Sequence, residues 1–371
     1  MGSEGSLRLV ERRRELRTGT NSWASRIRAE ALWTIALLFI CAHFAIFYAT
    51  DHKHSFSLST YATGLDGNPF QYRALTGWVI HYVARFEFLG RFAGHLPTAS
   101  WTPSIYDVIF LLLSLVMLVG ATVATRLSLV TLTNNRGFSR WASLLTIYMA
   151  YFTLLLGYSN NHTYPYDLTA LFFFCLGVSL VLARRLWIYY PVLVLAVLNR
   201  ETACLLILFF SICEWVSDAS LSPVQRVRKM APHLLAQGAI VFGLFFGMYL
   251  THLHSRNGIE PSGLAWLLWK LPYNLREIAK PWFWPLYLST AGFLLPVIAF
   301  QFRRIRERRI ELACALLLPV WFLALMVFGV ILEIRIFSEM ISIESLAISL
   351  IALHWFEDRM ASAGQFHSLQ P

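Results

Sequence analysis

About ten apolar runs, separated by short polar segments, constrain the fold of this chain more than any other feature. A helix needs roughly 20 apolar residues to cross a hydrocarbon core of about 30 Å. The chain has 371 residues, of which 57% are apolar and 14% charged, and its mean hydropathy is +0.55. Soluble domains average roughly 25% charged residues. The sequence therefore predicts an all-α integral membrane protein, a polytopic membrane helix bundle of about ten spans.

The predicted spans alternate in direction, and several are shorter than a full crossing. They are Ala31–Ala49, Ile105–Thr125, Trp141–Gly157, Leu168–Ala183, Leu186–Leu198, Thr202–Val216, Pro232–Leu253, Pro285–Phe300, Leu312–Leu332 and Met340–Trp355. The first run follows an Arg-rich segment and ends without a small-residue cleavage pattern. It therefore predicts a retained helix rather than a removed signal peptide.

The basic residues indicate the orientation of these spans. The chain has 31 Lys and Arg residues against 21 Asp and Glu. They lie in short clusters between apolar runs rather than along one helix face, so nucleic acid is not an expected partner. A cytoplasmic N-terminus places most of them in short cytoplasmic loops, as the positive-inside rule requires. We expect a cytoplasmic N-terminal segment (1–30), a transmembrane domain (31–355) and a cytoplasmic tail (356–371).

This topology leaves two long outer loops, 50–104 and 254–284. Within the first, residues 72–89 hold several ionisable side chains and form either a span or an amphipathic helix in the outer interface. The interfacial helix fits better, because a span would reverse every later loop. The second loop is rich in tryptophan, which is typical of an aromatic belt at the headgroups, and a lipid or sugar platform is the alternative.

Asp51 and Asp66 are the only carboxylates of the first outer loop before Arg73. A carboxylate at this position can accept a proton from a hydroxyl group that attacks a substrate, so both are candidate catalytic bases. Asp51 is alternatively a solvated residue beyond a helix end, and Asp66 part of an Asp-Gly turn. Arg73 suits a phosphate, because its guanidinium donates two parallel hydrogen bonds; an interfacial anchor is the alternative.

Asp167, Arg200 and Glu201 are expected to lie below the outer surface. Fourteen residues separate Arg185 from Arg200, which gives roughly 21 Å of helix, short of the ~30 Å core. Ionisable groups at membrane depth normally face a bundle interior or a wet cavity, which indicates a site. The alternatives are structural: Asn199 as a helix N-cap, acids in first helical turns, and an arginine reaching the headgroups.

No resident cofactor or metal is expected. The five cysteines all lie in apolar runs without metal-type spacing, so they are expected to be core or lipid-facing residues. His52 and His54 flank Lys53, but no third ligand accompanies them.

Three segments, PFQYRALTGW (69–78), YPYDLTALFFF (164–174) and LNRETACLLILFF (198–210), look like recurring pieces of bacterial membrane proteins grouped loosely with the GT-C superfamily of polytopic glycosyltransferases. The chain resembles that superfamily along most of its length, with a long first outer loop that bears acids. It departs from the pattern in two ways: no Asp-x-Asp or paired Glu follows the first span, and no soluble outer domain follows the last. The missing acidic pair leaves the base and any divalent metal requirement open.

The resemblance implies transfer of a sugar from a polyprenyl-phosphate carrier to a lipid or glycan acceptor at the outer face of the bacterial inner (plasma) membrane. Asp51 or Asp66 would be the base. The substrate-binding residues would be Arg73, Asp167, Arg200, Glu201 and Arg335, with the arginines on the leaving phosphate and the acids orienting the acceptor or the arginines. A polysaccharide polymerase is the nearest alternative, and a lipid-linked-sugar flippase or transporter the next. A transporter would be expected to have internal repeats or broken helices near the midplane, and neither is evident in the sequence.

Overall fold

The computed structural model describes residues 3–50, 57–64, 73–93, 104–155, 163–218, 220–252 and 264–368, and every regular element within them is a helix. The predicted all-α class is confirmed. Six helical segments are long and apolar enough to cross a membrane: Trp23–Thr50, Ile105–Thr133, Pro165–Leu182, Pro223–Met248, Arg308–Phe328 and Ile334–Ala361. A bent pair, Pro281–Phe293 and Leu295–Arg304, is a seventh candidate. These are the helices of an integral membrane protein.

The other predicted spans coincide with shorter helices. α9 (Leu186–Asn199) has 14 residues, as the spacing of its flanking arginines predicted. The others are α6 (Arg136–Ala142), α7 (Leu145–Ala150), η2 (Tyr151–Leu155), η3 (Glu201–Cys204) and α10 (Leu205–Ser217). Six long spans and one bent pair do not amount to ten, so the ten-span topology stays a prediction.

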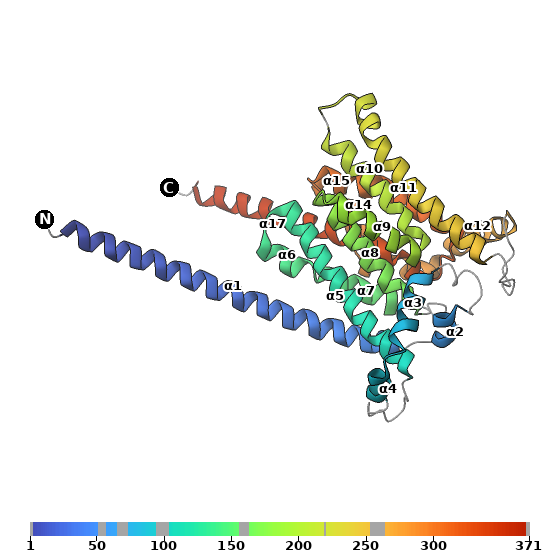
Figure 1. The fold of residues 1–371 in the computed structure, drawn as a ribbon. Coiled ribbons are helices and arrows are strands. Elements are labelled where there is room, and N and C mark those ends of the chain that lie inside the picture. Colours follow the sequence, from blue (N-terminus) through green and yellow to red (C-terminus); the bar gives the residue numbers. More distant parts are fainter. Residues whose placement is uncertain are drawn as a thin grey trace.

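The core of the bundle is built around α8 (Pro165–Leu182), of which 89% is buried. α8 packs most extensively against α5 (Ile105–Thr133), and α9 lies beside it (Figure 1). A Cβ atom on Gly120 of α5 would lie 2.6 Å from the Phe172 ring, so glycine allows the two helices to approach closely. α17 (Ile341–Ser368) completes the core, and 83% of the most apolar stretch of the candidate span Ile334–Ala361, to which it belongs, is buried.

The N- and C-terminal ends of the chain lie at the same end of the bundle (Figure 1). Glu30 of α1 (Ser3–Thr50) joins this end to α5 and α6, because it pairs with Arg126 at 2.6 Å and Arg140 at 2.7 Å. Arg306 pairs with Asp358 of α17 at this end as well. This is the end that the sequence predicts to be cytoplasmic.

Short helices cover the opposite end of the bundle: α2 (Leu58–Thr63), α3 (Ala74–Val83) and α4 (Glu87–Ala93). α3 has ten residues, about 15 Å, which is half of a crossing. A turn separates it from α4, so the described part of residues 72–89 is not one continuous span. The hydroxyl of Tyr61 donates to the backbone oxygen of Arg73 at 2.6 Å and ties α2 to the start of α3.

The predicted straight span Pro285–Phe300 is broken. α13 (Trp284–Ser289) leads into η5 (Thr290–Phe293), and α14 (Leu295–Gln301) follows at a bend of 74°. Ala291, Gly292 and Phe293 all have positive φ angles, 57°, 64° and 64°, which a continuous right-handed helix does not allow. The remaining elements are α11 (Pro223–His252), α12 (Leu264–Ile278), η4 (Pro281–Phe283), η6 (Phe302–Arg304), α15 (Arg308–Leu312), η7 (Ala313–Leu317), α16 (Leu318–Phe328) and η8 (Ile334–Met340).

Candidate functional site

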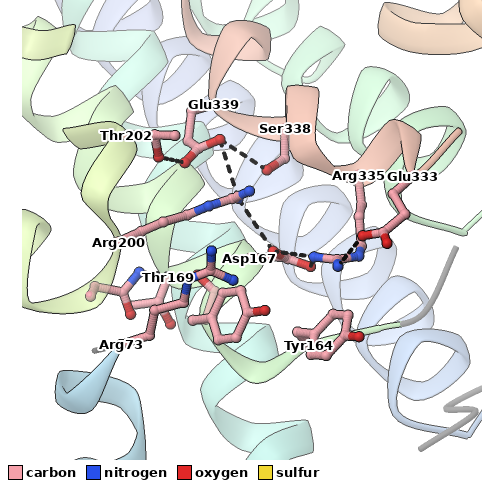
Figure 2. Close-up of polar contacts among 12 residues, drawn as sticks. Arg73, Tyr164, Asp167, Thr169, Arg200, Thr202, Glu333, Arg335, Ser338 and Glu339 are labelled. Carbon is pink, nitrogen blue, oxygen red and sulfur yellow. Dashed lines mark hydrogen bonds and ion pairs between the residues drawn. The ribbon is translucent and has the colours of Figure 1, made fainter. Parts of the chain in front are cut away.

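Asp167 lies at the centre of a polar cluster at the predicted outer end of the bundle (Figure 2). It occupies the first turn of α8, just after Pro165, and its side chain is 0% exposed. Nη1 of Arg200 lies 3.3 Å from its Oδ1, and Nη1 of Arg335 lies 3.4 Å from both of its carboxylate oxygens. One buried carboxylate therefore holds two arginines from distant parts of the chain.

Arg200 is placed by the break between α9 and η3, where its backbone is extended (φ −161°, ψ 138°). This conformation ends α9 and leaves a side chain that is only 3% exposed within the bundle. Its Nη1 also donates to Oε2 of Glu339 at 3.3 Å, and Glu339 in turn accepts from the hydroxyl of Thr202. The Nε of Arg200 is buried without a hydrogen-bond partner in the described part of the chain. Arg200 thus links α8, η3 and η8.

Arg335 belongs to η8, in the connection before α17. Besides Asp167 it donates to Glu333, and its guanidinium carbon lies 3.9 Å from the centroid of the Tyr164 ring. A guanidinium that lies over an aromatic face still has its edge free to donate hydrogen bonds. Tyr164 is itself fixed, because the hydroxyl of Tyr48 at the end of α1 donates to its backbone oxygen at 3.0 Å.

Arg73 and Glu201 form the more open part of the cluster. Nε and Nη2 of Arg73 donate to the two carboxylate oxygens of Glu201, a bidentate pair, with the Nε contact at 3.2 Å. The Arg73 guanidinium lies 4.5 Å from the centroid of the Tyr166 ring, which Arg200 also approaches at 6.0 Å. The Glu201 side chain is 46% exposed, whereas Asp167 and Arg200 are enclosed. The Arg73–Glu201 pair is therefore the part of the cluster nearest to solvent.

The acidity of Glu201 follows from these neighbours. Desolvation of its carboxylate by the surrounding protein raises its pKa, but the charge and hydrogen bonds of Arg73, followed by the charge of Arg200, outweigh this and lower the pKa to about 2. A carboxylate with so low a pKa is a weak base at neutral pH. Glu201 is suited to holding Arg73 in place rather than to accepting a proton.

A second set of hydrogen bonds fixes the short helices onto the bundle. The Thr76 hydroxyl of α3 donates to Oδ1 of Asn199 at 2.6 Å, and Nδ2 of Asn199 donates to the backbone oxygen of Tyr166 at 3.0 Å. Asn199 is the last residue of α9, and Arg200 is the N-cap of η3, so the alternative that Asn199 is a helix N-cap is wrong. Its amide instead connects α3, α8 and α9 beside Arg73.

The described cluster contains three arginines and four carboxylates, all of them in ion pairs. It is therefore not an empty, positively charged anion site. Buried ion pairs pay a large desolvation cost, which their mutual attraction offsets only when the geometry is good. An incoming phosphate would have to exchange with a carboxylate, and the pair with the most exposed acid is Arg73–Glu201.

The structure brings together Arg73, Asp167, Arg200, Glu201 and Arg335, the five residues predicted to bind substrate. The two predicted bases, Asp51 and Asp66, lie outside the described residues. Described residues on either side of them contact the site: Tyr48 of α1 donates a hydrogen bond to Tyr164, and Arg73 pairs with Glu201.

Two other outer acids lie apart from the cluster. Asp107 forms a capping box with Ser104 at the start of α5, and Glu277 pairs with Lys280 on α12. Sequence reasoning gave Glu339 no role, and it missed the two tyrosines, Tyr164 and Tyr166, on whose rings the arginines lie. The YPYD segment was the available signal, because it places both rings beside Asp167.

No protein-family model, curated protein or solved structure matches this chain. Within the described residues, no group of three or more His, Cys, Asp or Glu side chains is arranged to hold a metal ion. Arginines on aromatic faces and carboxylates that fix them can recognise a phosphate and the hydroxyl groups of a sugar.

Proposed function

We propose that the protein is a membrane glycosyltransferase that transfers a sugar from a polyprenyl-phosphate carrier to a lipid or glycan acceptor at the outer face of the membrane. The gathering of Arg73, Arg200 and Arg335 in one polar cluster supports this most strongly. They come from three separate segments, and a leaving phosphate is the group that such an arrangement suits.

The proposed reaction is a substitution at the anomeric carbon of the sugar. An acceptor hydroxyl attacks that carbon, the bond from the carbon to the phosphate oxygen breaks, and polyprenyl phosphate leaves. Arg73 takes the phosphate first, since it is paired with the partly exposed Glu201. The hydroxyl proton passes to Asp51 or Asp66, because the low pKa of Glu201 makes it a poor acceptor.

The topology belongs to this proposal. It consists of ten spans with both termini in the cytoplasm of a bacterial inner membrane, interfacial short helices in the first outer loop, and the polar cluster opening outward. Reporter fusions after Gly157 and after Arg185 test it, with an outer signal expected at the first position and a cytoplasmic signal at the second. A cytoplasmic signal after Gly157 would remove the outer-face site.

The direct test is release of polyprenyl phosphate from a labelled carrier by the purified full chain in liposomes. Arg73→Ala should abolish release, and Arg85→Ala should leave it unchanged. Arg85 is a matched control, because it is an exposed arginine just past the end of α3 that contacts only His81 and Tyr82 among the described side chains. Unchanged release by Arg73→Ala would overturn the role of Arg73. Growth of a glycan chain rather than a single transfer would favour the polymerase alternative.

A lipid-linked-sugar transporter is the second candidate, and the broken helix favours it. The bend of 74° between α13 and α14 is the kind of interrupted span that transporters use near the midplane. Movement of a fluorescent carrier lipid between the leaflets of proteoliposomes, without release of polyprenyl phosphate, would support transport over transfer.

A further inference from the structure

Glu344 is a single acid inside the apolar segment ISIESLAISL at the start of α17. It is 0% exposed, and both of its carboxylate oxygens are buried without a hydrogen-bond partner in the described part of the chain. It lies five residues after Glu339 of η8 in the sequence, in the first turns of α17, which runs toward the predicted cytoplasmic end. The polar cluster of the site does not use it.

The neighbouring polar groups are engaged elsewhere. The hydroxyls of Ser342, Ser345 and Ser349 all donate to backbone oxygens of α17 and η8, at 2.8, 3.3 and 2.6 Å. No described arginine, lysine or histidine forms an ion pair with Glu344. Among the described residues, the buried thiol of Cys314 on η7 is a titratable group that interacts electrostatically with Glu344.

An ionised carboxylate in such surroundings is far more costly than a neutral carboxylic acid, because neither water nor a cation compensates its charge. A cation would need several further oxygen ligands, and the described side chains supply no such group. A proton binds to one carboxylate oxygen and needs no further ligand. η7, a π-helical turn, is one of several elements that pack against α17, and such turns are frequent at functional sites.

We propose that Glu344 is a proton-binding site within the bundle. It holds a proton while α17 and η7 are packed as in this structure, and it releases the proton to entering water when that contact opens. The O–H bond of the carboxylic acid breaks, water takes the proton, and the carboxylate becomes solvated. Glu344 has this role whether or not a sugar is transferred at the cluster above it.

Infrared spectroscopy of the full chain in lipid nanodiscs tests the site. Wild-type protein at neutral pH should show the C=O band of a carboxylic acid without hydrogen bonds, and Glu344→Gln should lack it. Glu277→Gln is the matched control: Glu277 is paired with Lys280, so its loss should remove carboxylate absorption and leave the acid band.

Two results would overturn the proposal. One is loss of carboxylate absorption, rather than the acid band, in Glu344→Gln. The other is a glutamate signal that changes when sodium replaces potassium, which would indicate a cation site. Wild-type protein labelled with ¹³C on the glutamate carboxyl groups keeps the test independent of whether the variant folds, because absence of any acid band from labelled glutamate at neutral pH is equally decisive against it.

Discussion

Nη1 of Arg335 lies 3.4 Å from both carboxylate oxygens of Asp167, although 168 residues separate the two in sequence. Asp167 also receives Arg200, so a single carboxylate of α8 compensates two guanidiniums that are almost fully enclosed. η8 and the end of α9 are thereby joined through α8. The stability of this end of the bundle and the shape of the site depend on the same group.

Asp167→Asn should destabilise the protein severely. Asparagine preserves the shape of the side chain but removes its charge. Arg200 and Arg335 keep Glu339 and Glu333 as partners, so the loss should lie near the lower end of the roughly 3–5 kcal/mol that breaking a buried ion pair costs. Thermal unfolding of the purified protein measures this. Asp107→Asn is the control, because it weakens only the capping box with Ser104, a loss of about 1 kcal/mol. Equal losses in the two variants would contradict the central role of Asp167.

How much of the site the sequence predicts depends on the kind of signal. The length of α9 was enough to predict that Arg200 is buried, because a helix of only fourteen residues between two arginines places the second one inside the bundle. The pairing of Arg200 with Glu339 was not predictable, since it depends on how η8 folds back over α8. Arg335 was predicted as a substrate-binding residue only from the resemblance to a known superfamily. Its contact with Asp167 could not be predicted, because it depends on the three-dimensional arrangement of η8 and α8.

The broken helix could not be predicted from the sequence, whereas Glu344 could be noticed in it. Three successive left-handed residues, Ala291–Phe293, are stabilised by tertiary contacts such as the bond from the Ala291 amide to the Thr153 hydroxyl at 3.2 Å. Apolar periodicity does not report such contacts. Glu344 by contrast was visible as a lone acid in an apolar run, and charge at membrane depth is a signal that sequence reasoning can use.

Arg73→Lys should lower the proposed sugar transfer by at least tenfold while leaving the protein folded. Lysine keeps the charge, but it cannot form the bidentate contact with Glu201 or stack its charge as a plane on Tyr166. Initial rates of polyprenyl-phosphate release, compared with Arg85→Lys as control, measure the effect. A rate equal to wild type would show that only the charge of Arg73 matters.

Glu201 should make stability depend on pH in a defined direction. Its folded pKa of about 2 lies below the ordinary value of 4.5, so its ionised form stabilises the folded state fully above pH 4.5. That contribution should be lost as the pH falls from 4.5 toward 2. The difference in unfolding temperature between wild type and Glu201→Gln should therefore shrink over this window. A difference that stays constant down to pH 2 would contradict the ion pair with Arg73.

Gly292→Ala should destabilise the bend between α13 and α14. Gly292 has a φ of +64°, and an added Cβ would overlap the ring of Tyr148. Gly243→Ala is a matched control in α11, where an added Cβ meets no atom within 4 Å and alanine favours the helix by about 1 kcal/mol. Unfolding temperatures should fall for the first variant and stay equal or rise for the second. A tolerated Gly292→Ala would mean that the bend straightens readily.

Asn199→Asp should loosen the attachment of α3 to the bundle more than Thr76→Val does. The aspartate would face the backbone oxygen of Tyr166 with an acceptor in place of the Nδ2 donor, and it would bury a new charge beside Glu201. Thr76→Val only leaves Oδ1 of Asn199 without its donor, a loss of about 1–3 kcal/mol. Labelling of a cysteine introduced at Gly77, which lies against Tyr61, measures the exposure of α3. Faster labelling is expected in the order Asn199→Asp, Thr76→Val, wild type, and equal rates in all three would show that this end of α3 is held by packing alone.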